Sequence, residues 1–546
     1  MTPRAVALSV AAGLAMADAS IVTLALPDIL RELDTTIEGV AAVIAVYTLV
    51  IALALLPLER VASRTSVHVV GACGFALLAV SSGVCAAASS LPVLLVARSA
   101  QALGGAAGLA TVFELVGGVG GAGRKLWLGA AVFATALGPA VGGALTEAFS
   151  WRAIFVFQVP VGLAGAIAVL AAPGRVIPRE APPERRVALR PLLALGLVSA
   201  ALSAVLFLLV LLLVAGWNVS PLGAAGLVTV IPIAALVGAR IPGDQHSRAV
   251  AGCALVGGGV LALAWLPTAS VWWTIVPQLV AGLGMGLALT ALGGGLLPER
   301  TPRDAARLLT IRYAGIAALL AVAAPIAAHQ LPIATLKARE QGVALVLDAS
   351  LPPLDKIKLA PALLKGVESN QPRAGLRHAV AEQRHRFTGA DRAIYDQLGR
   401  RADETLTSAV EDAFRSSFLL SGAAGFLAAL VLLAGARMAV VLVAGAVAVG
   451  TPLVYAGLYR ALAPEPPAIL DPCTAHRKPP SVGGLTGLLQ RQALVLLDKT
   501  ACRLGSSREE LVLALADKDD AKRFEREHGV NPRTLGGLLQ GLVGGG

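Results

Sequence analysis

Residues 138–162 read GPAVGGALTEAFSWRAIFVFQVPVG, and this stretch decides the fold. A GPxxGG run lies in an uncharged apolar segment, a short polar break containing Trp-Arg follows, and a second apolar segment then begins. Gly138, Gly142 and Gly143 leave patches without side chains, on which a neighbouring helix can approach closely. Pro139 removes one backbone donor and bends the helix at the same place. The stretch therefore predicts two membrane helices, the first of them bent and suited to act as a hinge.

The composition predicts a polytopic membrane protein. The chain has 546 residues, of which 56% are hydrophobic and 14% charged, and its mean hydropathy is +0.75. Water-soluble domains are less apolar than this. Apolar blocks of about 20 residues have the length that crosses a ~30 Å hydrocarbon core as a helix, and they must be helical because lipid offers the backbone no partners. Thirteen such blocks lie at 5–27, 39–58, 67–89, 92–113, 126–146, 153–172, 191–215, 219–239, 249–267, 271–297, 308–330, 416–436 and 438–459.

The distribution of basic residues predicts the orientation. If the N-terminus is cytoplasmic, sixteen Lys and Arg residues fall on the cytoplasmic side, whereas the short outer loops receive only Arg31 and Arg152. This asymmetry follows the positive-inside rule. With thirteen spans the C-terminus is then extracytoplasmic. The net charge of +11 is explained by the cytoplasmic loops, and no nucleic-acid partner is expected.

The spans and the polar stretches between them predict the domain organisation. Hydropathy falls sharply between the eleventh and twelfth spans, where amphipathic helices are expected, separated by LPPLDK and SNQPR. The last of these helices keeps a helical spacing of apolar residues, so the twelfth span is expected to continue as a stalk from about residue 400. The predicted parts are an N-terminal six-helix bundle (1–174), a cytoplasmic linker (175–190), five further spans (191–330), an extracytoplasmic helical insertion (331–415), the last two spans (416–460), a proline-rich linker (461–480) and a small extracytoplasmic helical tail (481–546).

Ionisable residues inside spans are costly and mark functional sites. The candidates are Asp18, Arg98 and Glu114, all in the first bundle. Asp18 lies roughly 20 Å above the inner end of its helix and Arg98 roughly 10 Å below the outer end of its own. In a ~30 Å core these depths coincide, so an Asp–Arg pair is expected. The pair either exchanges protons or is a structural ion pair, and Glu114 is either functional or a solvated helix end.

Two cysteines lie in the tail and three in apolar spans. Cys73, Cys85 and Cys253 are interpreted as small packing residues. Cys473 and Cys502 are expected to form a disulfide, because an odd number of spans places the tail in an oxidising space. The alternative is a pair of free thiols in a cytoplasmic tail, which requires one span more or fewer.

No motif predicts an enzyme, a cofactor or a metal site. His378, Glu382 and His385 share one helical face at a spacing that can hold a metal, but a solvated amphipathic face is the preferred interpretation. The sequence has no phosphate-binding loop, no nucleophile elbow and no CxxC pair.

Four motifs in order resemble those of the major facilitator superfamily, close to its drug:proton antiporter branch of multidrug exporters. ADASIVTLALPDI (17–29) resembles the helix-1 motif LDxTIVNVALPxI, and RSAQALGGA (98–106) resembles the helix-4 motif RxxQGxGxA, with Gln101 at the glutamine. GPAVGG (138–143) is similar to the helix-5 antiporter motif, and WRAIFVFQVPVG (151–162) to WRWIFxINxPxG, with Gln158 in place of Asn. The loop LPLERVASRTS at 56–66 departs from the usual GxLaDrxGRr, and Glu59, Arg60 and Arg64 are interpreted as its remnants.

The resemblance implies an all-α membrane protein of two six-helix bundles, to which this chain adds one C-terminal span and extracytoplasmic helices. It implies alternating access with substrate near the midplane, and export coupled to proton entry across the plasma membrane. Asp18 and Arg98 would be the coupling pair, with Gly138 and Pro139 at the hinge. The expected partners are a small-molecule substrate, protons and the lipid bilayer.

Two other functions stay open at this point. The chain could be a non-transporting anchor or sensor whose outer module binds an envelope partner, or an exporter of an envelope lipid or metabolite. The intact helix-1 and helix-5 motifs favour the exporter of hydrophobic or amphiphilic small molecules.

Overall fold

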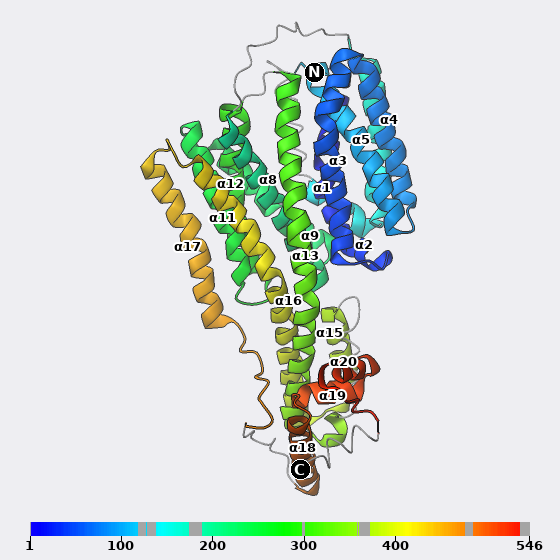
Figure 1. Ribbon diagram of the computed structural model, residues 1–546, viewed down its shortest axis with the longest axis vertical. Helices are drawn as coiled ribbons and strands as arrows, with labels where there is room; N and C mark the ends of the chain where they lie inside the picture. The colour runs from blue at the N-terminus through cyan, green and yellow to red at the C-terminus, as the bar shows by residue number, and fades with distance from the viewer. Residues whose placement is uncertain are drawn as a thin grey trace. The chain divides into compact units, whose positions relative to one another are not determined.

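The computed structural model describes residues 2–117, 127, 138–173, 188–297, 301–356, 359, 372–474 and 484–534. Within these ranges the regular elements are helices (Figure 1). Those of the first half of the chain are α1 (Pro3–Thr23), α2 (Leu26–Glu32), α3 (Ile37–Arg64), α4 (Val67–Ala87), α5 (Leu91–Leu115), α7 (Arg152–Leu170), α8 (Leu189–Val210), η1 (Leu211–Gly216), α9 (Pro221–Val228), α10 (Val230–Arg240), α11 (Gln245–Ala262) and η2 (Leu263–Trp265). The others are η3 (Val271–Thr274), α12 (Ile275–Ala291), η4 (Leu292–Leu296), α13 (Pro302–Asp348), α15 (Pro372–Gln383), η5 (Arg384–Arg386), α16 (Gly389–Leu432), α17 (Met438–Leu462), α18 (Gly484–Arg503), α19 (Arg508–Ala516) and α20 (Lys518–His528).

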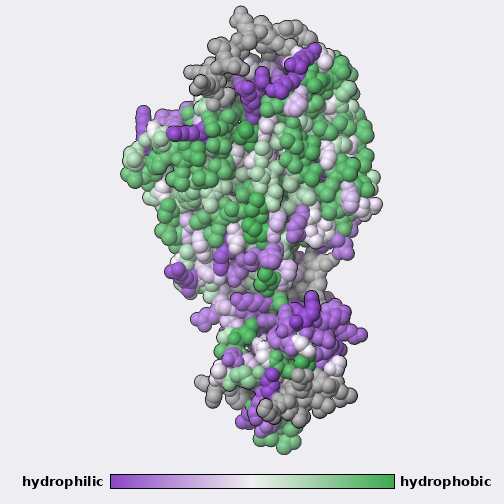
Figure 2. Space-filling view, viewed as in Figure 1, coloured by the Kyte–Doolittle hydropathy of each residue, from purple (hydrophilic) through white to green (hydrophobic). Residues whose placement is uncertain are grey.

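Twelve helical segments among the described residues are long and apolar enough to cross a membrane. They coincide with twelve of the thirteen predicted spans. Most of the remaining predicted span, 126–146, lies outside the described residues, as does most of the predicted linker 175–190. The surface over these segments is predominantly hydrophobic in Figure 2, as expected for helices that face lipid.

Helix boundaries follow from capping residues in the sequence. Thr36, Ser66 and Ser220 accept hydrogen bonds from backbone N–H groups in the first turns of α3, α4 and α9. Such side chains satisfy donors that have no partner inside the helix. The prediction of a loop at 56–66 was wrong, because α3 continues to Arg64 and Ser66 already caps α4. With no glycine there to end the helix, the segment stays helical up to the cap.

Two pairs of neighbouring helices pack through reciprocal glycines. On α4 and α5, a Cβ added to Gly74 would lie 2.9 Å from the carbonyl oxygen of Gly104, and one added to Gly104 would lie 2.6 Å from that of Gly74. Gly252 on α11 and Gly284 on α12 repeat the arrangement, at 2.7 and 2.6 Å. Glycine allows the backbones to approach this closely, so the same packing device recurs in each half of the chain.

The chain divides into two compact units. The transmembrane unit comprises residues 1–215, 219–329 and 414–461, and the insertion–tail unit comprises residues 216–218, 330–413 and 462–546. The predicted continuation of the twelfth span is present as the 44-residue helix α16. The eleventh span also continues without interruption, as the 47-residue helix α13, which extends beyond the predicted end of this span at residue 330.

The insertion–tail unit has a hydrophobic core of its own. Leu351, Leu376, Tyr395 and Leu406 are buried in one cluster, and Phe387 stacks on Tyr395 with ring centroids 4.4 Å apart. Salt bridges join the tail to the insertion within this unit. Arg508 Nη2 lies 2.8 Å from Asp348 Oδ1, so the tail belongs to the same folded unit as the insertion.

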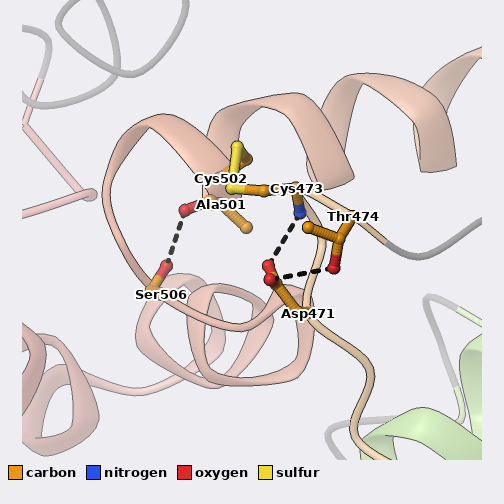
Figure 3. Close-up of a disulfide and its surroundings, with 6 residues drawn as sticks. All are labelled: Asp471, Cys473, Thr474, Ala501, Cys502 and Ser506. Atoms are coloured by element: carbon orange, nitrogen blue, oxygen red, sulfur yellow. Dashed lines mark hydrogen bonds between the residues drawn. A yellow bond between two sulfur atoms is a disulfide. The ribbon is translucent and has the colours of Figure 1, made fainter.

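The tail itself is built around a disulfide (Figure 3). Cys473 and Cys502 are bonded, with their Cα atoms 5.0 Å apart. Asp471 accepts hydrogen bonds from the backbone of Cys473 and the hydroxyl of Thr474, which fixes the turn that carries Cys473. The bond therefore attaches the chain that leaves α17 to the C-terminal end of α18. The other three cysteines are free thiols.

Candidate functional site

An ion pair lies inside the transmembrane unit between α1 and α5. Arg98 Nη2 lies 2.6 Å from Asp18 Oδ2, and the two side chains are 0% and 1% exposed. Tyr47 on α3 covers the pair: the Arg98 guanidinium lies 4.2 Å from the centroid of its ring. The Tyr47 hydroxyl donates to the Ala15 carbonyl at 3.0 Å, which ties α3 to α1 beside Asp18. The two charges are thus paired and removed from the surface.

Two glutamine amides complete a closed ring with this ion pair. Arg98 Nη1 donates to Gln101 Oε1 at 2.5 Å, and Gln101 Nε2 donates to Gln158 Oε1. Gln158 Nε2 in turn donates to Asp18 Oδ1 at 2.8 Å. Gln101 and Gln158 are also fully buried. The ring joins α1, α5 and α7, so the carboxylate is held by an ion pair from α5 and a hydrogen bond from α7.

Ser82 on α4 and a residue of the other half border the ring. The Ser82 hydroxyl accepts from Gln101 Nε2 at 2.7 Å and donates to Gln158 Oε1 at 3.3 Å. Tyr313 on α13 is buried and interacts electrostatically with Tyr47 and Asp18. The side chains that contact this ring or belong to it thus come from α1, α3, α4, α5 and α7.

The glycines of the GPAVGG run lie at close helix contacts. Residues 138–148 are helical, and a Cβ added to Gly142 would collide with the carbonyl oxygen of Ile21 on α1. A Cβ added to Gly143 would lie 2.9 Å from the carbonyl oxygen of Pro221 on α9. In the same region Glu147 Oε2 accepts from the backbone N–H of Leu222 at 2.8 Å. This helix therefore contacts both α1 in the first half and α9 in the second.

Other predicted site residues do not join the ring. Glu114 lies sixteen positions after Arg98 on α5, which is roughly 24 Å along a helix. Glu59, Arg60 and Arg64 lie in the last turns of α3, where Glu59 is buried and the two arginines are not. Pro139 is buried in the helical segment beside Gly138.

The proposed metal-binding spacing is not a single helical face. His378 and Glu382 lie on α15, but His385 lies on the 3-10 turn η5. Among the described residues, the side chains whose ligand atoms come within 4.8 Å of one another are Glu510, Glu527 and His528 of the tail. His528 Nε2 lies 3.0 Å from Glu510 Oε1, so these two side chains already pair with each other.

Sequence reasoning missed the role of Gln158 and of Glu32. Gln158 was noted only as a departure from a motif. Glu32, at the end of α2, binds the Trp-Arg pair that precedes and begins α7: Trp151 Nε1 and Arg152 Nη1 both donate to its carboxylate. Burial alone would raise the pKa of Glu32, but the hydrogen bonds from Arg152 and Trp151 outweigh it and lower the pKa. Glu32 and Trp151 lie 119 positions apart, with α3, α4 and α5 between them, so no local spacing in the sequence signalled this contact.

Comparison with known proteins identifies the family. The model of the Major Facilitator Superfamily matches residues 8–328, which is more than half of the chain. The chain belongs to the major facilitator superfamily. The resemblance to this superfamily and the expected all-α polytopic membrane fold are therefore confirmed.

Relatives and solved structures extend this result. The chain is 33% identical over 244 residues to a proposed multidrug resistance protein, MdtD, from Escherichia coli O6:K15:H31 (strain 536 / UPEC), covering 43% of this chain and 48% of that protein. MdtD from Escherichia coli O1:K1 / APEC matches with the same identity and coverage. The chain thus spans about half the length of these relatives. Their names agree with the predicted drug:proton antiporter branch.

The fold resembles that of a bacterial homologue of the human lysosomal transporter Spinster. Its crystal structure in an inward-facing, occupied conformation aligns with a TM-score of 0.54 at 16% identity, covering 79% of this chain and 97% of the other. The unoccupied form gives a TM-score of 0.52 at 15% identity, with 79% and 98% coverage. These likenesses concern the fold alone.

Proposed function

We propose that this protein exports hydrophobic or amphiphilic small molecules in exchange for protons. The observation that carries the proposal is the fully buried pair of Asp18 and Arg98. A buried ionised pair costs several kcal/mol in desolvation, which packing against apolar residues would avoid. Charged groups at this depth are functional by default, and the family is one of transporters. The relatives named for multidrug resistance support the substrate class.

In the proposed cycle Asp18 is the proton acceptor. A hydronium ion that reaches the carboxylate from outside gives it a proton and leaves a water molecule. Asp18 is then neutral, and its attraction to Arg98 is lost. The helix of residues 138–148, packed on α1 through Gly142 and on α9 through Gly143, is the element along which the two halves would rearrange. Release of the proton inside restores the ion pair.

The test uses proteoliposomes and a lipophilic cation. Purified protein is reconstituted, a pH gradient is imposed, and the gradient-driven movement of tetraphenylphosphonium is compared between wild type and Asp18→Asn. The Asn side chain keeps an acceptor oxygen for Arg98 but cannot be protonated, so we expect a folded protein without gradient-driven movement. Asp28→Asn, which removes an acid near the membrane surface, is the matched control and should transport like wild type. Undiminished transport by Asp18→Asn would contradict the proposal.

A second candidate function is that of an anchor whose insertion–tail unit binds an envelope partner, and a third is export of an envelope lipid or metabolite. The separate hydrophobic core of the insertion–tail unit favours the second candidate. The tetraphenylphosphonium assay also distinguishes the anchor from the proposed exporter. If neither wild type nor Asp18→Asn moves the cation under any gradient, the anchor function gains support.

The proposed location is the plasma membrane, with the N-terminus cytoplasmic and the insertion–tail unit outside. The disulfide supports this orientation, because such bonds persist in oxidising compartments. An impermeant thiol reagent added to intact cells should label Cys473 and Cys502 only after treatment with a reductant. The Cys473→Ser/Cys502→Ser variant is the control. Labelling that requires cell lysis would place the tail in the cytoplasm instead.

A further inference from the structure

Asp18 and three other side chains form a ring in which each hydrogen bond runs in one direction. Arg98 donates to Gln101, Gln101 donates to Gln158, and Gln158 donates to Asp18. Arg98 also contacts the second carboxylate oxygen of Asp18 directly. Both branches therefore start at Arg98, which can only donate, and end at a carboxylate, which when ionised can only accept.

We propose that Gln158 is a positioning residue for the coupling acid: with Gln101 it forms a ring of donors that favours the ionised form of Asp18. This inference rests on the proposed function for its biological meaning, but its geometry is independent of any substrate. The side chain of Gln158 reaches Asp18 from α7, a helix that carries no charge of its own between Ala153 and Leu170.

Protonation of Asp18 sets donor against donor in this arrangement. A proton on the lone pair of Oδ1 that now accepts from Gln158 Nε2 would face this donor, so the Gln158 amide would have to turn and present its oxygen. Its nitrogen would then face Gln101 Nε2, and the Gln101 amide would have to turn as well. The Gln101 nitrogen would finally face Arg98 Nη1, and the hydrogen bond between these two groups would be lost, since a guanidinium offers no acceptor.

A proton on the other carboxylate oxygen leads to the same result more directly. Oδ2 lies 2.6 Å from Arg98 Nη2, so a proton there opposes a donor at once. In both cases Arg98 loses the attraction of a negative charge and an acceptor that faced it. Its other partners are the Val43 carbonyl oxygen, to which Nε donates at 3.3 Å, and the face of Tyr47. Both remain available when Asp18 is neutral, so Arg98 would move toward α3 and away from α1.

Few other groups near Asp18 can change their charge or hydrogen bonding when it is protonated. In the part of the chain that the structure describes, the titratable groups that interact with Asp18 are Arg98 on α5, Tyr47 on α3, Cys85 on α4 and Tyr313 on α13. Ser82 can donate or accept and therefore tolerates either direction of the amides. Protonation of Asp18 can therefore affect Arg98 in two ways. One is direct, through the contact at Oδ2, and the other passes through the amides of Gln158 and Gln101.

The experiment titrates Asp18 in the full-length protein in detergent by infrared difference spectroscopy. The carboxyl C=O band that is absent from Asp18→Asn reports its protonation. Gln158→Leu removes one hydrogen bond to a charged group, so the midpoint of the band should rise by roughly 1–2 pH units. Gln278→Leu is the matched control: Gln278 is also fully buried but lies on α12 and donates to Thr274. Its midpoint should equal that of wild type.

Two further variants keep the test decisive. Gln101→Leu frees the Gln158 amide to turn, so it should raise the midpoint by less than Gln158→Leu does. If Gln158→Leu does not fold, as judged by its melting temperature, Gln158→Met tests the same bond with an unbranched side chain. A folded variant at position 158 that titrates like wild type would overturn the proposal. The titration requires no transport, so a failed flux assay would leave this result interpretable.

Discussion

Asp18 and Arg98 lie eighty positions apart on α1 and α5, yet their charged groups are 2.6 Å apart and almost wholly buried. Among the described residues Arg98 is the cation that pairs with Asp18, and Gln158 donates to the other carboxylate oxygen. The pair, rather than either residue, is therefore the unit whose disruption has measurable consequences.

Replacing Arg98 by Leu should destabilise the protein strongly. Removal of one partner leaves Asp18 charged and buried, which costs about 3–5 kcal/mol. The measurement is thermal or denaturant unfolding in detergent. Arg31→Leu is the control, because Arg31 is 37% exposed in its pair with Asp28 and should change stability by about 0–1 kcal/mol. Equal effects of the two variants would contradict a structural role for the buried pair.

Replacing Gly142 by Ala should force the helix of residues 138–148 away from α1. The added methyl group meets backbone atoms of Ile21, which cannot turn aside as a side chain can. Overpacking of this kind costs about 1–3 kcal/mol, and gradient-driven transport should fall with it. A methyl group added at Gly226 on α9 meets nothing within 4 Å, so Gly226→Ala should be close to neutral. Melting temperature and cation flux are compared for the two variants.

Loss of the Cys473–Cys502 disulfide should loosen the tail. The bond closes a loop of 29 positions, for which the loss of chain entropy predicts a contribution of about 3.5 kcal/mol. The double Ser variant should show faster hydrogen exchange in α18 and α19 and a lower unfolding temperature of the insertion–tail unit. Cys73→Ser, which removes a free thiol, should do neither. Unchanged exchange in the double variant would mean that packing alone holds the tail.

Arg373 should matter more than its neighbour Arg377, although both bind the same carboxylate. Arg373 contacts both oxygens of Asp403 at 2.9 Å and also donates to the Trp217 carbonyl at 3.1 Å. Arg377 is 58% exposed. Arg373→Ala should therefore lower the stability of the insertion–tail unit by about 2 kcal/mol, and Arg377→Ala by less than about 1 kcal/mol. Because Trp217 lies in the turn before α9, hydrogen exchange in residues 216–218 should rise only in the first variant.

Lys356 should make the insertion–tail unit more stable at alkaline pH. Burial, with Arg508 nearby, lowers the pKa of this amine to about 8 from an ordinary value of 10.5, although it donates to the Leu347 carbonyl. Between these two values the unfolded chain binds more protons than the folded one, so stability rises with pH across this window. Lys356→Met should abolish this rise. Lys522, an exposed residue paired with Asp519, provides the control substitution.

The sequence by itself determined the membrane helices and their family. Spans of about 20 apolar residues must be helices in lipid, so composition was sufficient for twelve of the thirteen predicted blocks. The order of four motifs then indicated the superfamily. The depth of a residue in the membrane follows from the number of residues between it and the end of its helix. The positions of Asp18 and Arg98 therefore predicted that the two side chains would meet. The distance between Arg98 and Glu114 along α5 is what showed that Glu114 does not belong to this pair.

Only the tertiary structure decided which side chains complete the site and how the polar segments fold. Gln158 and Gln101 lie 57 positions apart, and no periodicity within one helix tells which faces of α5 and α7 turn toward each other. Likewise, hydropathy ends a span where the apolar residues end, whereas the backbone of α13 stays helical through Asp348 because it packs within the insertion–tail unit. Composition sets what a segment can be buried in, but helix rotation and long-range packing set its neighbours.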